Sequence, residues 1–112
     1  MEEISTPFAA RYNENKPQVS LILDASDALY GATEVLAFGA KKYSRCNFLK
    51  GFPYTELVDS MLRHIISFHK GEDIDSESAL PHVDHILCNA LFLSQTYHQG
   101  NAKDDRHKEE EV

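Results

Sequence analysis

The chain is short of basic charge, and its apolar residues form no long run. Eleven Lys and Arg residues stand against 18 Asp and Glu residues, which gives a formal net charge of −7 over 112 residues. Because binding along a phosphate backbone requires a basic stripe, this balance argues against a nucleic acid polymer as partner. A free nucleotide remains compatible with the charge, since a divalent cation can bridge carboxylates and phosphate oxygens.

Two further absences concern the location of the protein. No segment approaches the ~18 continuous apolar residues of a membrane span, and the N-terminus has no apolar signal core. Cys46 and Cys88 are the only cysteines, and they form no closely spaced pair. We therefore expect a cytoplasmic protein with reduced thiols and no membrane partner.

Helical periodicity is present in three segments, without strand-like alternation or internal repeats. The segments run from Asp24 to Tyr43, from Tyr54 to about His69, and from about Pro81 to His98. Asp24 or Ser26 is a plausible N-cap of the first helix, and a short fourth element is expected near Val19 to Leu23. With 42% apolar residues there is material for one modest core. The sequence thus predicts one all-α domain.

The segments outside these helices are polar. Residues 1–17 are interpreted as an N-terminal arm that docks late or only on assembly, residues 18–99 as the helical domain, and residues 100–112 as a disordered charged tail. Three helices make a thin core, and the last has more apolar surface than two neighbours can cover. We therefore expect a small helical bundle of three main helices completed by homo-oligomerisation, as a homodimer or homotetramer.

The last predicted helix carries a polar line on an otherwise apolar surface. His82, His85, Asn89 and Thr96 follow one another at spacings of three, four and seven residues. A helix that is apolar on most sides should be largely buried, and buried polar groups need partners. The line is therefore expected to face a metal, a ligand or a satisfied hydrogen-bond network. Asp84 points away from it and is interpreted as a first-turn carboxylate favoured by the helix dipole.

The other two helices also carry polar stripes. Asp27, Glu34 and Lys41 repeat every seven residues on the first helix, where they form either an active-site wall or an ion-paired exterior. The second helix has a polar arc that an ordinary solvated face would also show; it includes Glu56, Asp59, Arg63 and His64. Gly31 and Gly39, which weaken an isolated helix, predict the close approach of another helix or a ligand.

Several spaced motifs cover roughly residues 10 to 97. They are Arg11-Tyr12-Asn13, Lys16-Pro17, Phe38-Gly39-Ala40-Lys41-Lys42-Tyr43, Asn47-Phe48, Leu62-Arg63-His64, Gly71-Glu72-Asp73-Ile74-Asp75-Ser76-Glu77-Ser78 and His82-x-x-His85-x-x-x-Asn89. Together they resemble the small phage-borne family named for dATP/dGTP diphosphohydrolase. The resemblance implies a relation to the all-α nucleoside triphosphate pyrophosphohydrolases of the MazG type, which hold divalent ions with acidic clusters.

The activity that this resemblance implies is metal-dependent hydrolysis of purine deoxynucleoside triphosphates, dATP or dGTP, to monophosphate and pyrophosphate with Mg²⁺ or Mn²⁺. Carboxylates three residues apart on a helix can hold such an ion and position water. The implied catalytic residues are Glu34, Glu56 and Asp59. The same three residues, with Asp75, His82 and His85, are the implied metal ligands. The implied substrate-binding residues are Lys41, Arg63, His64 and Asn89.

The acidic pattern is incomplete, because Tyr30 and Gly31 stand where the pyrophosphohydrolases have paired glutamates. This departure keeps three alternatives open. One is a non-catalytic phage protein of the host cytoplasm that binds or sequesters a nucleotide. Another is a metallohydrolase built on His64, His82 and His85, with Asp75 as an optional further ligand, since imidazole favours Zn²⁺, Mn²⁺ or Ni²⁺ over Mg²⁺. The last is a purely structural helical oligomer.

Overall fold

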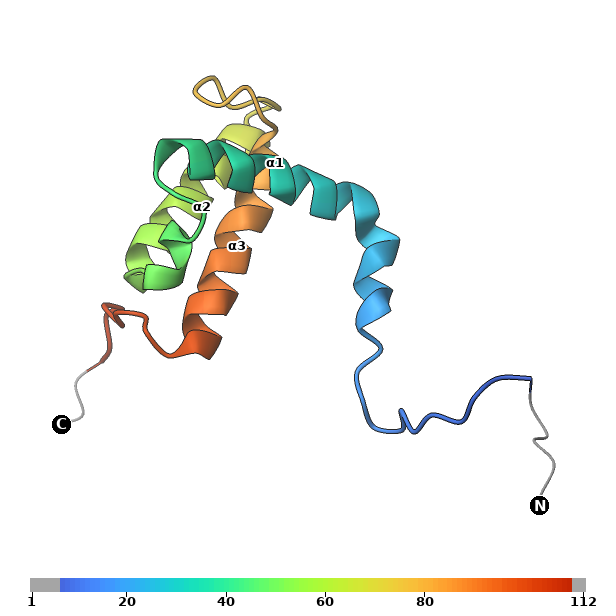
Figure 1. Ribbon diagram of the computed structural model, residues 1–112. Coiled ribbons are helices and arrows are strands. Elements are labelled where there is room, and N and C mark those ends of the chain that lie inside the picture. Colours follow the sequence, from blue (N-terminus) through green and yellow to red (C-terminus); the bar gives the residue numbers. More distant parts are fainter. Residues whose placement is uncertain (1–6, 110–112) are drawn as a thin grey trace, which may run out of the picture.

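The computed structural model describes residues 7–109, and this part of the chain contains helices but no strand. In chain order the elements are the 3-10 helix η1 (Val19–Ala25), the α-helix α1 (Ser26–Lys42), the 3-10 helix η2 (Asn47–Lys50), and the α-helices α2 (Tyr54–His69) and α3 (His82–Gln99) (Figure 1). The predicted all-α class with three main helices is confirmed. No described helix is both long enough and apolar enough to cross a membrane.

The helix boundaries lie within two residues of the predicted ones, and η1 confirms the short element before the first long helix. The predicted N-caps of α1 are wrong. Asp24 lies inside η1 and Ser26 is the first residue of α1, while Ala25 occupies the cap position without a side-chain hydrogen bond. Because η1 runs directly into α1, no extended residue precedes the helix to act as a cap.

Helices α2 and α3 pack side by side, and α1 crosses α3 near the end where α3 begins (Figure 1). Gly31 of α1 lies against the carboxylate of Asp84 in the first turn of α3, so closely that a Cβ on Gly31 would overlap it. The predicted close approach at Gly31 is confirmed. At Gly39 an added Cβ would meet nothing within 4 Å.

The hydrophobic core of the described residues is small: Ala32, Val35, Leu57 and Cys88. On α3 the polar line is more buried than the apolar face. His82, Asn89 and Thr96 are buried, whereas Val83, Leu87 and Leu91 remain 37–45% exposed. The expected burial of α3 thus holds for its polar line. Part of its apolar surface is left uncovered, as expected for a bundle of only three helices.

The N-terminal part of the chain projects away from the three α-helices (Figure 1). Residues 7–18 are exposed, and residues 1–6 lie outside the described part. The radius of gyration is 19.8 Å, against about 13 Å for a compact chain of 100 residues. Four apolar side chains of η1 are 56–75% exposed: Val19, Leu21, Ile22 and Leu23. The helical body therefore leaves these side chains of η1 largely uncovered.

The described part of the C-terminal tail differs from the expected disorder. The Tyr54 N–H donates to the Lys103 carbonyl at 3.0 Å, and the Lys103 N–H donates to the Phe52 carbonyl at 3.2 Å. Asp105 accepts from the backbone N–H of Thr55 at 3.0 Å and from its hydroxyl. Because Pro53 at the N-cap of α2 makes no side-chain cap bond, Asp105 takes that role from the tail. Residues 110–112 lie outside the described part.

Candidate functional site

The connector between α2 and α3 is folded against the start of α3. Gly71, with φ of 97°, follows the last turn of α2. The N–H groups of Gly71 and Glu72 donate to the carbonyls of Phe68 and Ser67 at 2.9 and 3.1 Å. These two hydrogen bonds form a Schellman motif. The motif requires a residue of positive φ, which explains the glycine. The Asp75 N–H then donates to the Leu80 carbonyl at 2.9 Å. The chain is thereby folded back, with Asp75 held close to α3.

Asp75, Ser78 and His85 form a chain of hydrogen bonds. The Ser78 N–H and hydroxyl both donate to Oδ2 of Asp75, at 2.9 and 2.8 Å, and the Ser78 Oγ lies 2.7 Å from Nε2 of His85. The same Oγ accepts from the Leu80 N–H at 3.2 Å. Since the hydroxyl proton goes to Asp75, His85 must donate its Nε2–H to Ser78. This assigns the proton of neutral His85 to Nε2 and leaves the Nδ1 lone pair free.

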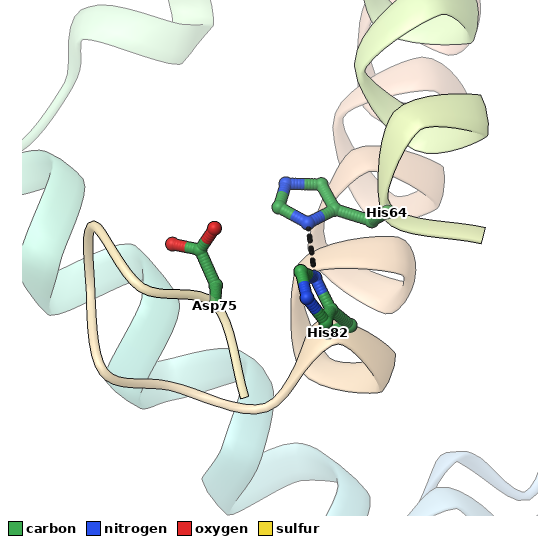
Figure 2. A group of neighbouring side chains, drawn as sticks. All are labelled: His64, Asp75 and His82. Atoms are coloured by element: carbon green, nitrogen blue, oxygen red, sulfur yellow. Dashed lines mark hydrogen bonds between the residues drawn. The ribbon is translucent and has the colours of Figure 1, made fainter. Parts of the chain in front are cut away.

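Three histidines meet beside this chain. His64, from α2, faces His82, the first residue of α3, with their Nδ1 atoms 2.8 Å apart (Figure 2). The ring of His64 also stacks on the ring of His85, with centroids 4.4 Å apart and planes 5° apart. One ligand atom from each of His64, Asp75 and His82 lies within 4.8 Å of the other two. The predicted polar line of α3 thus reaches an imidazole–carboxylate cluster.

The cluster favours neutral imidazoles and an ionised carboxylate. Burial lowers the pKa of His64 below its ordinary value, and the neighbouring His85 lowers it further. Burial also lowers the pKa of His85, against the opposing effect of Asp75. For Asp75, burial raises the pKa, but the hydrogen bonds from the Ser78 N–H and hydroxyl outweigh it and bring the pKa below its usual range. At neutral pH the site therefore offers unprotonated ring nitrogens and a negative charge.

The cluster opens into a cavity of about 790 Å³ between α1, the η2 loop and α3. Its polar wall is formed by Ser60, His64, Asp75, Glu77, His85 and Asn89. Asn89 is oriented by donating from Nδ2 to the Ser60 Oγ at 3.2 Å and to the His85 carbonyl at 3.0 Å. Cys88 also lines the cavity, where burial raises the pKa of its thiol to about 11. At neutral pH this group is a thiol rather than a nucleophilic thiolate.

An aromatic wall and two basic side chains complete the cavity. The rings of Phe48 and Phe52 both stack on Phe92, with centroids 5.1 and 5.4 Å apart. Lys42 and Arg45 lie on the side of the cavity formed by α1 and the loop after it, and Lys42 pairs with Glu77 at 3.2 Å. The site thus combines flat apolar surface, positive charge and an imidazole–carboxylate cluster.

The structure divides the residues that the sequence singled out. His64, Asp75, His85 and Asn89 line the cavity, and His82 adjoins it through His64. The remaining five are exposed and do not line it: Glu34, Lys41, Glu56, Asp59 and Arg63. The roles proposed for those five stay predictions of the sequence pattern.

Sequence reasoning gave no role to several cavity residues. Ser78 stands three positions after Asp75, a spacing at which an aspartate commonly bonds to the following turn, so this contact had a local signal. The aromatic wall had none, because Phe48 and Phe52 come from a loop and meet Phe92 of α3 only in the folded chain. Arg45 likewise lies in the segment between α1 and η2, where helical periodicity says nothing.

Comparison with known proteins points to the family that the sequence motifs resemble. A protein of Salmonella phage PMBT28 named dATP/dGTP diphosphohydrolase is 33% identical over 72 residues, which are 64% of this chain and 24% of that protein. The chain therefore spans about a quarter of the length of this relative. No solved structure matches. Residues 8–106 match the family described as "dATP/dGTP diphosphohydrolase, N-terminal", and the chain belongs to that family.

Proposed function

We propose that the chain binds purine deoxynucleoside triphosphates in the cavity and takes part in their hydrolysis to monophosphate and pyrophosphate. The observation that carries this proposal is the pairing, in one cavity, of the imidazole–carboxylate cluster with the phenylalanine wall. A volume of about 790 Å³ is in the range of small-molecule sites. The family name supplies the substrate class.

The cavity lining offers groups that suit both the base and the phosphates of such a substrate. The rings of Phe48, Phe52 and Phe92 offer a flat apolar surface on which a purine base can stack. Lys42 and Arg45 supply positive charge for the phosphates, and Arg45 adds the planar donors that suit phosphate oxygens. Asn89 and Ser60 contribute neutral polar groups to the same lining. The net charge of −7 makes local positive charge necessary for an anionic ligand.

In the proposed reaction the oxygen of a water molecule bonds to the α-phosphorus. The bond from that phosphorus to the oxygen bridging to the β-phosphate breaks, and pyrophosphate leaves with the bonding pair. His85 accepts the proton of the water at Nδ1, because its Nε2–H is committed to Ser78. Asp75, ionised and bonded to Ser78, stabilises the imidazolium that forms.

A divalent cation is part of this proposal, with Mg²⁺ or Mn²⁺ as the ions that the family resemblance implies. The donor set of His64, Asp75 and His82 suits a cation, since it combines ring nitrogens with an ionised carboxylate. When bound, the ion would offset phosphate charge and lower the pKa of water.

Nucleotide binding without hydrolysis is the second candidate. It is favoured by the exposed positions of Glu34, Glu56 and Asp59 outside the cavity. In this case the cavity residues hold the nucleotide as described, and the protein sequesters it.

The test is to incubate the protein with a panel of ribo- and deoxyribonucleoside triphosphates and Mg²⁺ or Mn²⁺. Products are followed by chromatography while the melting temperature is recorded with each nucleotide. Release of deoxynucleoside monophosphate and pyrophosphate in equal amounts supports hydrolysis and identifies the base. Stabilisation without products supports the binder. The absence of both products and stabilisation would contradict the proposal.

We also propose that the protein works as a homodimer or homotetramer. The exposed apolar residues of η1 and the uncovered Val83, Leu87 and Leu91 of α3 support this, because a second copy would cover them. Light scattering after gel filtration measures the mass. Replacing Leu21 and Ile22 together by Glu should shift that mass to the monomer while leaving the melting of the helical body unchanged, because both side chains lie on η1 and are exposed. A wild-type monomer would contradict the proposal.

A further inference from the structure

We propose that His64, Asp75 and His82 form a resident binding site for a first-row transition-metal dication such as Zn²⁺ or Co²⁺, which is filled without nucleotide. The inference goes beyond the Mg²⁺ or Mn²⁺ of the proposed reaction and does not depend on that reaction. One ligand atom of each residue lies within 4.8 Å of the other two. The three residues come from α2, the connector and the first turn of α3 (Figure 2).

The first argument is the unsatisfied nitrogen of His82. This residue is only 3% exposed, and its Nε2 is buried without a hydrogen-bond partner, with Oε1 of Glu72 3.6 Å away. A neutral histidine that ligates a metal through Nδ1 must carry its proton on Nε2, and such histidines usually donate that proton to a carboxylate. Metal binding at Nδ1 would therefore make His82 Nε2 a donor to Glu72.

The second argument is the meeting of two ring nitrogens. The Nδ1 atoms of His64 and His82 are 2.8 Å apart, so without a cation one of them must carry a proton and donate it to the other. Two ring nitrogens that already lie this close can both bind one dication in place of the proton, once the rings turn and move slightly apart to make room for metal–nitrogen bonds of about 2.0–2.1 Å.

The two carboxylate oxygens of Asp75 differ in their contacts. Both hydrogen bonds from Ser78 and the approach of His85 Nε2, at 3.7 Å, are made to Oδ2. No hydrogen bond from another described residue reaches Oδ1. An ionised carboxylate with one oxygen fixed by hydrogen bonds and the other free is suited to bind a cation through the free oxygen.

The donor types select the metal. Two imidazoles and one carboxylate match the preference of Zn²⁺ and other late first-row dications, whereas Mg²⁺ prefers oxygen ligands and keeps its waters. Glu72 adds negative charge beside His82. Three protein ligands also leave coordination positions for water or a phosphate oxygen, which is typical of catalytic rather than structural zinc sites.

The experiment uses the full chain, stripped with a chelator and then titrated with Zn²⁺ or Co²⁺ without nucleotide. We expect about one ion per chain by calorimetry, a rise in melting temperature, and a visible Co²⁺ absorption band that Zn²⁺ removes. An equal concentration of Mg²⁺ should displace neither ion. These readouts are independent of turnover, so metal binding and hydrolysis can succeed or fail separately.

Variants connect the signal to the cluster. His64→Gln and Asp75→Asn should each abolish the Co²⁺ band, and Glu72→Gln should weaken binding by about 10-fold because it removes only the partner of His82. His69→Gln is the matched control, since His69 lies on the same helix as His64 but is exposed at its end. Absence of Co²⁺ and Zn²⁺ binding in the folded wild type, or equal binding in His64→Gln, would overturn the proposal. Circular dichroism shows whether each variant is folded.

Discussion

His64 and His82 face each other through their Nδ1 atoms at 2.8 Å, although they are 18 positions apart in the sequence. The contact joins the polar arc of α2 to the buried polar line of α3, two features that helical periodicity identifies separately. It also places both rings beside Asp75 and His85, so that one cluster contains ligating and proton-accepting groups.

Ser78→Ala tests the proton-accepting role of His85. The change removes the hydroxyl that joins Nε2 of His85 to Oδ2 of Asp75, so the tautomer of His85 is no longer fixed. We expect kcat for triphosphate hydrolysis to fall by about 10- to 100-fold, with KM nearly unchanged. Steady-state kinetics measures both. Ser76→Ala is the control, since Ser76 is an exposed residue of the same connector. Equal turnover rates in both variants would show that the Ser78 hydroxyl has no role in the reaction.

Gly31→Ala tests the crossing of α1 over α3. The added methyl group would overlap the carboxylate of Asp84, so the helices must move apart, at a cost of about 1–3 kcal/mol in the free energy of unfolding. Gly39→Ala is the matched change on the same helix. It meets nothing within 4 Å and should stabilise the helix by about 0.5–1 kcal/mol. Urea denaturation measures both.

A second change identifies the cause of that loss. Shortening Asp84 in the double variant Gly31→Ala/Asp84→Ala removes the atoms that the methyl group meets. The double variant should therefore be less destabilised than the sum of the two single variants. Simple additivity would mean that the glycine is required for another reason.

The sequence allowed the helices to be predicted, because the apolar periodicity of α1, α2 and α3 is a local property. It also identified the polar line on α3, since buried and exposed positions alternate with the helical period. The sequence did not predict how the polar stripes of α2 and α3 contact each other. Helical wheels place His64 and His82 on faces, but which faces touch depends on the Schellman turn at Gly71 and on the folded connector.

The same limit explains the tail and the aromatic wall. Residues 101–106 are polar and charged, which locally favours disorder, yet Asp105 caps α2 from 50 positions away. The capping partner of a helix can come from anywhere in the chain, so composition alone cannot reveal it. Phe48, Phe52 and Phe92 likewise come together only through the packing of the η2 loop on α3.

The stability of the metal-free protein should fall as the pH drops below about 6.5. Burial lowers the pKa values of His64 and His85 in the folded chain. Between those lowered values and the ordinary value the unfolded chain therefore binds more protons than the folded one. The stabilisation is complete above the unfolded pKa and is lost as the pH falls toward the folded pKa.

Melting temperatures between pH 5 and 8, recorded with a chelator present, measure this effect. His85→Gln should flatten the profile, because a glutamine does not titrate. The exposed variant His69→Gln should keep the wild-type slope. A wild-type melting temperature that is constant from pH 8 to pH 5 would contradict the neutral cluster.

The double variant Glu56→Gln/Asp59→Asn decides between the two sets of acidic candidates. The sequence pattern favours these helix carboxylates as metal and water ligands, whereas the structure leaves both exposed and outside the cavity. If the cavity carries the reaction, the double variant keeps its turnover, and Asp75→Asn loses it because the connector carboxylate no longer carries the charge that the cluster requires. Side-by-side rates with Mn²⁺ give the comparison. Loss of turnover in the double variant, with Asp75→Asn still active, would instead move the reaction to the outer face of α2. A second copy or another domain would then be expected to complete the site, because both carboxylates are exposed and lie outside the cavity.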